Sequence, residues 1–372
     1  MSEIFFSPIN SVLSNKAAGT IVVGQSGAGK TFCLVNIAAS ALEQGCNIFA
    51  LDAKNDMLAL RNLYPGIKIT DVNKIAPGSL DPFLIFHEVD TTMILTIVEI
   101  ICGKLSTEQK LAVTPIIGDF VNKAKLTHTA NFRDFANYLY QNQNPAAQAV
   151  GNQLLINANT QYGPILFGEP GVRSRGIMVG RESRIISIFG MPLPTGTSTP
   201  RADEMLSSAI VYIICCMLRN ILTRKNVNKK QKGAEQEKKR PALLIFDECH
   251  ILMRSNEIKD IIDELLVLGR SLNVGVIAAS QNVTHFDEKL AQHFSSKFTF
   301  KMSKREAAEF FELFNNTTTE NELDISECIE VTTRLKSGYC FFIDNKERCT
   351  LIHIVSPYDT GDITSNPLFK KR

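Results

Sequence analysis

The stretch GQSGAGKT, residues 24–31, follows the apolar run TIVV and precedes an apolar segment with helical character. It satisfies the pattern GxxxxGK[ST] in the required context of a strand before it and a helix after it. Glycines in such a loop let successive backbone amides turn inward around phosphate groups, and the amino end of the helix adds partial positive charge. We therefore predict a nucleotide phosphate site, with a glycine-rich turn that holds no ligand as the alternative.

Individual residues of this loop have separate predicted roles. The Lys30 ammonium reaches the terminal phosphates of ATP, and the Thr31 hydroxyl ligates Mg²⁺. The residues expected to bind the nucleotide are Gly24, Gln25, Ser26, Gly27, Ala28, Gly29, Lys30, Thr31 and Phe32.

The order of elements around the loop predicts an α/β fold. A strand (TIVVG), a helix over residues 30–44 and a strand over residues 47–52 form a βαβ unit, which implies a mainly parallel sheet covered by helices. Between about residues 86 and 160 the periodicity is helical, and STEQ at 106–109 is typical of a capping box. We expect a core interrupted by an all-α insertion, with segments 1–85 (core), 86–170 (insertion) and 171–372 (core).

Composition narrows the class of protein without identifying it. The 372 residues are 44% hydrophobic and 21% charged, with a net charge of +2, which is typical of a soluble globular protein and too small to indicate nucleic-acid binding. Nine cysteines without a CxxC pair indicate reduced thiols. The most apolar windows, 93–103 and 209–218, are shorter than the ~20 residues of a membrane span, and we see no signal peptide.

A second motif, LLIFDECH, places two acids at the carboxyl end of a buried strand, the sheet edge where ligands bind in open α/β folds. Asp247 is expected to hold Mg²⁺ through water, and Glu248 to activate the attacking water as general base. Such an adjacent acid pair favours hydrolysis. The alternative is a strand-end pair that caps the next helix.

Two further residues flank the strand that follows the acid pair. Gln281 ends VGVIAASQ, where its amide can sense the γ-phosphate; the alternative is a polar turn residue. Arg270 ends the amphipathic helix predicted over residues 257–269 and can act as an arginine finger in a neighbouring subunit's site. A helix C-cap is the other interpretation of Arg270.

Several polar residues are compatible with more than one role. Asp52, Lys54 and Asp56 follow the second strand, where helix capping and catalysis are equally compatible with the residues. His250 is the one histidine beside the predicted site, and no metal ligand beyond those of Mg²⁺ is assigned. The charged run 226–240 is interpreted as a solvated loop, with DNA contact as the alternative.

Taken in order, these motifs resemble those of the VirB/TraC/TrbE-type ATPases of conjugation and type IV secretion, within the HerA/FtsK superfamily of hexameric RecA-like motors. The segments that carry the resemblance span nearly the whole chain: GQSGAGKT, LDAKNDMLAL, LDPF, LSTEQ, GPILFGE, IISIFGMPLP, LLIFDECHILM, LGRSLNVGVIAASQN and KSGYCFFID. The resemblance implies a RecA-like P-loop fold with an all-α insertion. It makes Lys30 and Thr31 the Walker A pair and Asp247 and Glu248 the Walker B pair.

The resemblance also implies a cellular role. It predicts an ATP hydrolase that works as a homo-oligomer, a hexamer or other ring, with secretion subunits, DNA or a secreted protein as partners. Its expected place is the cytoplasm, at the inner membrane through the secretion complex. Members of the family typically carry an N-terminal docking domain, whereas this loop begins after only 23 residues. We expect either a C-terminal ATPase fragment or a short member.

Alternative functions remain compatible with the same motifs. One is a HerA/FtsK-type translocase that pumps DNA directly. Another is an ATP-gated assembly scaffold with little turnover. A kinase or small-molecule transferase fits less well, because the sequence has no acceptor-binding motif and the acid pair favours attack by water.

Overall fold

The computed structural model describes residues 6–7, 19–86, 89–127, 130–169, 176–177, 180–194, 199–223, 240–284, 286–314 and 325–356. The chain forms two compact units. The first covers Met1–Asp71, Arg181–Gly190 and Leu222–Arg372, and the second covers Val72–Gly180 and Met191–Ile221. The second unit begins at residue 72 rather than 86, extends to 180 rather than 170, and also includes residues 191–221. The domain division stays a prediction. The predicted loop 226–240 lies outside the described residues except for Arg240.

A nine-stranded sheet organises the first unit, in the order β3-β4-β2-β5-β6-β1-β7-β8-β9. All neighbouring pairs from β3 to β7 are parallel, and β8 and β9 are each antiparallel to the strand before them. The strands are β1 (Gly19–Val23), β2 (Asn47–Asp52), β3 (Lys68–Asp71), β4 (Arg184–Ser187), β5 (Ala242–Phe246), β6 (Val274–Ser280), β7 (Phe294–Thr299), β8 (Tyr339–Ile343) and β9 (Cys349–His353).

The strands around β1 are buried along their whole length, which explains their sequences. Every residue of β1, β5 and β6 is buried. Parallel strands covered on both faces need continuous apolar runs, and TIVV, ALLIF and VGVIAA are such runs. Because these strands are parallel, their carboxyl ends share one edge of the sheet, where the motif residues follow them.

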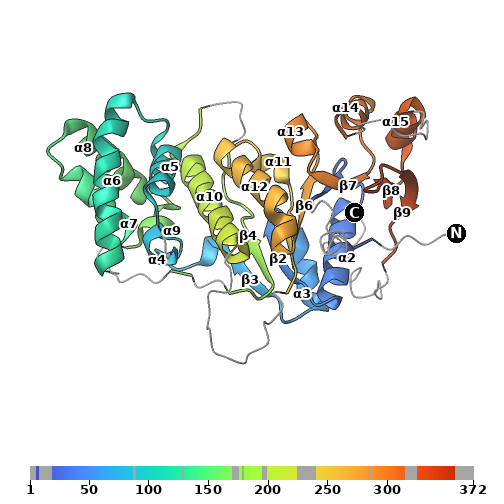
Figure 1. The fold of residues 1–372 in the computed structure, drawn as a ribbon, viewed down its shortest axis with the longest axis horizontal. Helices are drawn as coiled ribbons and strands as arrows, with labels where there is room; N and C mark the ends of the chain where they lie inside the picture. Colours follow the sequence, from blue (N-terminus) through green and yellow to red (C-terminus); the bar gives the residue numbers. More distant parts are fainter. Residues whose placement is uncertain are drawn as a thin grey trace. The chain divides into compact units, whose positions relative to one another are not determined.

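Helices of the first unit connect these strands, and Figure 1 shows α14 and α15 near β8 and β9 at the orange-to-red end of the chain. The helix α12 begins at its cap Ser255 and continues to Leu272, beyond the predicted end at residue 269. Arg270 therefore lies within the last helical turn. The helical elements are α2 (Lys30–Glu43), η1 (Asp56–Ala59), α3 (Leu60–Leu63), α11 (Cys249–Leu252), α12 (Asn256–Leu272), α13 (Glu288–Ala291), α14 (Lys304–Phe314) and α15 (Ile325–Arg334).

The described residues of the second unit are helical without any strand, as expected for the insertion. The capping box is present: Gln109 N donates to Ser106 Oγ, and Ser106 N donates to Gln109 Oε1. Figure 1 shows α6, α7 and α8 packed together. The elements are η2 (Val72–Lys74), α4 (Pro82–Ile85), α5 (Thr91–Cys102), α6 (Thr107–Thr127), α7 (Phe132–Tyr140), α8 (Pro145–Ala158), α9 (Gly163–Phe167) and α10 (Ala202–Thr223), whose last two residues belong to the first unit.

The helix α10 is longer than the apolar window 209–218 that the sequence indicated. Its 22 residues are long and apolar enough to cross a membrane by length and composition, and 72% of its apolar window is buried inside the protein. Such burial is typical of a core helix. All nine cysteines lie within the described residues, and none forms a disulfide.

Candidate nucleotide site

Glycine residues shape the loop between β1 and α2. Gly24, Gly27 and Gly29 have φ values of 155°, 78° and 111°, which residues with side chains rarely adopt. A Cβ on Gly24 would lie 2.6 Å from the Phe300 Cβ, and one on Gly29 would lie 3.0 Å from the Gly338 nitrogen. The loop thus needs glycine for both its backbone conformation and its close packing.

Neighbouring segments fix this loop through its backbone. Gln25 N donates to the Lys301 carbonyl at 2.8 Å. On the other side, Gly338 N donates to the Ala28 carbonyl at 3.1 Å, and Ser337 Oγ donates to the Gly27 carbonyl at 3.1 Å. Because α2 begins at Lys30 with no side-chain cap, its first amides remain available to an anion.

The Lys30 side chain folds over the loop. Its Nζ donates to the carbonyls of Gly24 at 2.6 Å and Gln25 at 3.2 Å. Burial lowers the pKa of Lys30, an effect that the Glu248 carboxylate opposes and the Lys54 charge reinforces. The contacts of Lys54 with Glu248 and of Asp56 with Thr31 bring the acid pair and the phosphate loop to one site.

Asp247 presents a buried oxygen without a hydrogen-bond donor. The residue is 4% exposed, and its Oδ2 has no partner among the described residues. Burial, together with the nearby carboxylates of Asp52 and Glu248, raises the pKa of Asp247 to about 7. A buried acceptor surrounded by other acids fits a divalent cation, which supplies the missing positive charge.

Two donors contact one oxygen of the Glu248 carboxylate, whereas its buried Oε2 has no hydrogen-bond partner in the described part of the chain, and the residue has an unusual backbone conformation. Its Oε1 accepts from Lys54 Nζ and, at 2.9 Å, from Gln281 Nε2, while His250 Nδ1 lies 3.0 Å from Oε2. Burial alone would raise the pKa of Glu248, but the contacts with His250, Lys54 and Gln281 outweigh it and lower the pKa to about 2. Its φ of 57° is left-handed, a strained state that often marks functional sites.

The loop after β2 shows Asp52 in a capping role and contributes two further contacts to the site. The Asp52 carboxylate accepts from the backbone amides of Lys54 at 3.0 Å, Asp56 at 3.2 Å and Met57 at 3.0 Å, so it caps this loop. Thr31 Oγ1 donates to Asp56 Oδ2 at 3.1 Å. The sequence did not reveal that Lys54 contacts Glu248 or that Asp56 contacts Thr31. The available signal was the charged pattern directly after a strand.

Not every predicted site residue lies at this edge. Gln281 follows β6 and reaches Glu248, whereas Arg270 precedes β6 and is exposed. A seven-residue strand separates them, which is roughly 23 Å at about 3.3 Å per residue. Phe32 is half-buried in the first turn of α2.

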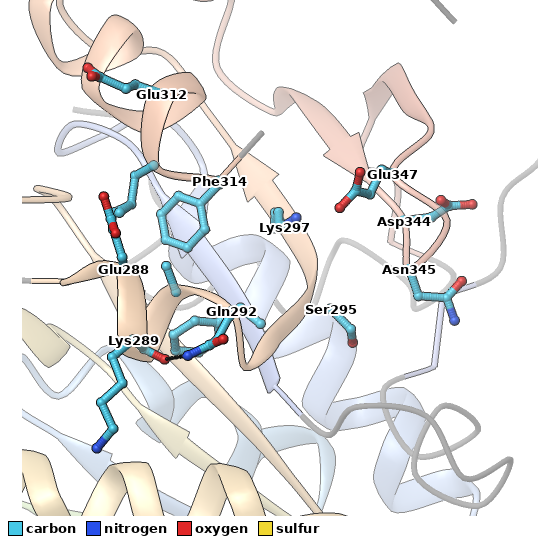
Figure 2. Close-up of a pocket in the computed structure, with 13 residues that line it drawn as sticks. Glu288, Lys289, Gln292, Ser295, Lys297, Glu312, Phe314, Asp344, Asn345 and Glu347 are labelled. Carbon is cyan, nitrogen blue, oxygen red and sulfur yellow. Dashed lines mark hydrogen bonds between the residues drawn. The ribbon is translucent and has the colours of Figure 1, made fainter. Parts of the chain in front are cut away.

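A pocket elsewhere in the first unit contains none of these residues. It has a volume of about 580 Å³ and lies between α13, α14 and the turn from β8 to β9. Figure 2 shows Lys297 between these elements, with its nitrogen toward Glu347. Burial lowers the pKa of Lys297, and Glu347 opposes that shift. The pocket is therefore polar and separate from the phosphate loop.

The fold and site define a P-loop nucleoside triphosphatase class, and comparison with known proteins specifies the family. A model of the AAA-like domain family matches residues 11–362, so the chain belongs to this family. The predicted ATPase class is thereby confirmed. No curated protein matches the chain in sequence.

Solved structures share the fold at low sequence identity. VirB4 of Thermoanaerobacter pseudethanolicus is 15% identical, with a TM-score of 0.67 over 92% of this chain and 90% of that chain. The plasmid coupling protein TrwB with the ATP analogue ADPNP is 16% identical, with a TM-score of 0.60 over 93% and 87%. TrwB with ADP and Mg²⁺ is 15% identical, with a TM-score of 0.58 over the same shares. These matches confirm the predicted mainly parallel P-loop fold and the resemblance in fold to conjugation and secretion ATPases.

Proposed function

We propose that the chain hydrolyses ATP with Mg²⁺ to energise a conjugation or type IV secretion apparatus, as a ring or other oligomer. The observation that carries the proposal is the convergence of the glycine-rich loop and the buried acid pair at one sheet edge, with Asp247 Oδ2 unpaired and Glu248 Oε1 accepting from two donors. The fold shared with VirB4 and with TrwB, which is described as a bacterial conjugative coupling protein, supports the secretion context.

Each residue of the site has a proposed role. Residues 24–32 bind the nucleotide, with the amides at the start of α2 and the Lys30 ammonium on the phosphates, and Thr31 and Asp247 hold Mg²⁺. Bound Mg²⁺ neutralises phosphate charge. Glu248 accepts a proton from the attacking water, and Gln281 orients its carboxylate through their hydrogen bond.

Arg270 acts, in this proposal, on a neighbouring copy of the chain. Its position at the opposite end of β6 places it away from the site of its own subunit. An arginine finger supplied by a neighbour is worth about 10³- to 10⁵-fold in rate. Arg270→Ala is expected to reduce turnover strongly, and mixing it with a Lys30 variant is expected to restore some hybrid sites. Because Asn273 is the C-cap of α12, the helix C-cap interpretation of Arg270 is wrong. If both experiments leave turnover unchanged, Arg270 is only a basic residue in the last turn of that helix.

The proposed oligomeric state, partners and cellular place are those of conjugation and secretion ATPases. Homo-oligomerisation as a hexamer, contact with other secretion subunits, and a cytoplasmic place at the inner membrane through that complex are all proposals. So is the cargo, DNA or a secreted protein.

Glu248→Gln tests the assignment of the base. The amide keeps the size of the side chain and can accept a hydrogen bond but cannot take up a proton, so ATP binding should persist while turnover falls about 10²- to 10⁴-fold. Glu288→Gln, on an exposed residue of α13, is the matched control. Unchanged turnover in Glu248→Gln would remove Glu248 from the mechanism.

A second measurement separates the alternative functions. The purified chain is analysed for mass and hydrolysis, with and without ATP and Mg²⁺, and with and without DNA. DNA-stimulated hydrolysis that falls steeply with salt favours a DNA translocase. Slow turnover with assembly that follows ATP occupancy favours a scaffold.

A further inference from the structure

The pocket between α13, α14 and the turn from β8 to β9 contains a buried lysine. Lys297 is 7% exposed and lines the pocket, and Figure 2 shows its nitrogen directed toward Glu347. The volume of about 580 Å³ lies within the range of about 300–1,000 Å³ that is typical of small-molecule sites. Ligand binding here is independent of the proposed ATP hydrolysis, because the pocket contains no residue of the nucleotide site.

Lys297 occupies a strand position that suits an apolar side chain. In the register of the sheet it lies between Ile21 of β1 and Ile343 of β8, which are both buried. Within the described residues, its ammonium has no hydrogen-bond or ion-pair partner, whereas Lys289 of the same pocket is paired with Asp263. A buried charge without a partner is unfavourable, so an anion that enters the pocket would be stabilised there.

The turn from β8 to β9 does not supply that anion. The Asp344 carboxylate is fully engaged within the turn: its Oδ2 accepts from Arg348 Nε at 2.8 Å, and its Oδ1 accepts from two backbone amides of the turn. These bonds fix the backbone, in which Glu347 has a left-handed φ of 60°. Glu347 acts on Lys297 through its charge, without an ion pair between them.

Carboxylates also line the more exposed part of the pocket. Glu312 of α14 is exposed and Glu347 is half-buried, and neither carboxylate has a hydrogen-bond or ion-pair partner in the part of the chain that the structure describes. Phe294 and Phe314 add apolar surface. A purely anionic ligand would be repelled by these acids, and a purely cationic one would leave the buried ammonium unpaired. A ligand with both charges satisfies both parts of the pocket.

We propose that this pocket binds a basic amino acid, either free or as the C-terminal residue of a peptide. Its α-carboxylate pairs with Lys297 Nζ, and its side-chain guanidinium or ammonium group lies at Glu312 and Glu347. The aliphatic part of the ligand side chain packs against Phe294 and Phe314. The free amino acid and the peptide terminus share this chemistry and differ at the α-amino group.

Four ligands test the two ends of the pocket by isothermal titration calorimetry on the nucleotide-free chain. Arginine carries both charges, agmatine lacks the carboxylate, and citrulline lacks the charge of the guanidinium. We expect arginine to bind, and agmatine and citrulline to bind about ten- to a hundredfold more weakly, the range for one hydrogen bond to a charged group. The fourth ligand, N-acetylglycylarginine, has an amide in place of the α-amino group. Affinity at least equal to that of arginine indicates a peptide terminus, and weaker binding indicates the free amino acid.

Variants should remove these preferences separately. Lys297→Met removes the buried ammonium, so arginine should bind no more tightly than agmatine. Glu347→Gln keeps Lys297 and should instead reduce the difference between arginine and citrulline. Lys346→Met removes a charge of the same sign from an exposed residue of the same turn and should bind arginine as the wild type does. If Lys297→Met fails to fold, Glu347→Gln and the four ligands still test the site.

Two results would overturn the proposal. One is no binding of either arginine or N-acetylglycylarginine at millimolar concentration. The other is equal affinity for arginine, agmatine and citrulline, or an affinity for arginine that Lys297→Met leaves unchanged. Calorimetry without ATP gives these answers whether or not the chain hydrolyses ATP, so failure of the proposed function and failure of this site are distinguishable.

Discussion

Two loops at the same edge of the sheet build the site in different ways. The loop after β1 (residues 24–31) depends on backbone conformation, with glycine at three positions of positive φ. The loop after β2 (residues 53–57) depends on side chains, with Asp52 as an internal cap and Lys54 and Asp56 as contacts to other segments. The first kind of loop has a fixed local spacing in sequence. The second acquires its meaning from residues far away in the chain.

Among the residues of these two loops, the largest effect is expected at the one side chain on which the loop after β1 depends. Lys30→Ala removes an ammonium that lies over the loop carbonyls and is 7% exposed. We expect kcat/KM for ATP to fall at least about 100-fold, which is about 2.7 kcal/mol. Binding of a fluorescent ATP analogue and phosphate release measure the loss, with Lys304→Ala, at an exposed residue of α14, as control. Near-normal binding would show that the backbone amides suffice.

The next largest effect concerns the internal cap of the loop after β2. Asp52→Ala leaves three backbone amides without their acceptor, at about 1 kcal/mol each. Burial raises the pKa of Asp52 to about 6, so removing this carboxylate also relieves an unfavourable buried charge. The net loss of unfolding free energy is therefore expected near 2 kcal/mol by chemical denaturation. Asp119→Ala, on an exposed part of α6, is the control, and equal stability of both variants would contradict the capping role.

The contrast between the loops also explains what the sequence could predict. The strand before Gly24, the acids after β5 and the glutamine after β6 follow from local apolar runs and the residues that end them. The contacts of Lys54 with Glu248 and of Gly338 with Ala28 join residues about 200 to 300 positions apart. They depend on the strand order β2-β5-β6-β1-β7-β8, which no local pattern encodes.

Predicted helix limits failed for a related reason. The sequence places Arg270 at the end of its helix, but α12 continues to Leu272 and ends at Asn273 in a left-handed conformation. Residues 191–221, which include most of α10, belong to the helical second unit. The burial of α10 depends on tertiary packing, which its position after β4 in the sequence does not reveal. The fold class and the strands that precede the motif residues were predictable from sequence, whereas the long-range contacts of those residues were not.

A smaller effect is expected where the two loops meet. Asp56→Ala removes the acceptor of the Thr31 hydroxyl, which then loses its fixed orientation. Residues that orient a metal ligand typically contribute about 10- to 100-fold in metal affinity, and we expect the lower end because Asp56 is half-buried. The Mg²⁺ concentration for half-maximal ATP hydrolysis should rise about tenfold. Thr31→Ser keeps the hydroxyl and should stay near the wild type; an unchanged Mg²⁺ requirement in Asp56→Ala would separate the two loops functionally.

The smallest effect is expected at a side chain that braces the loop after β1. Ser337→Ala removes an exposed hydrogen bond to the Gly27 carbonyl, while the backbone bond from Gly338 to Ala28 remains. Because the glycines and the backbone bonds define the loop, the change should cost under about 1 kcal/mol and raise the KM for ATP less than about fivefold. Gly338→Ala is the informative partner variant, since its φ of 84° strains any side chain at that position. A loss in Ser337→Ala as large as that in Lys30→Ala would mean that the loop after β1 also depends on distant side chains, and the difference between the two loops would no longer hold.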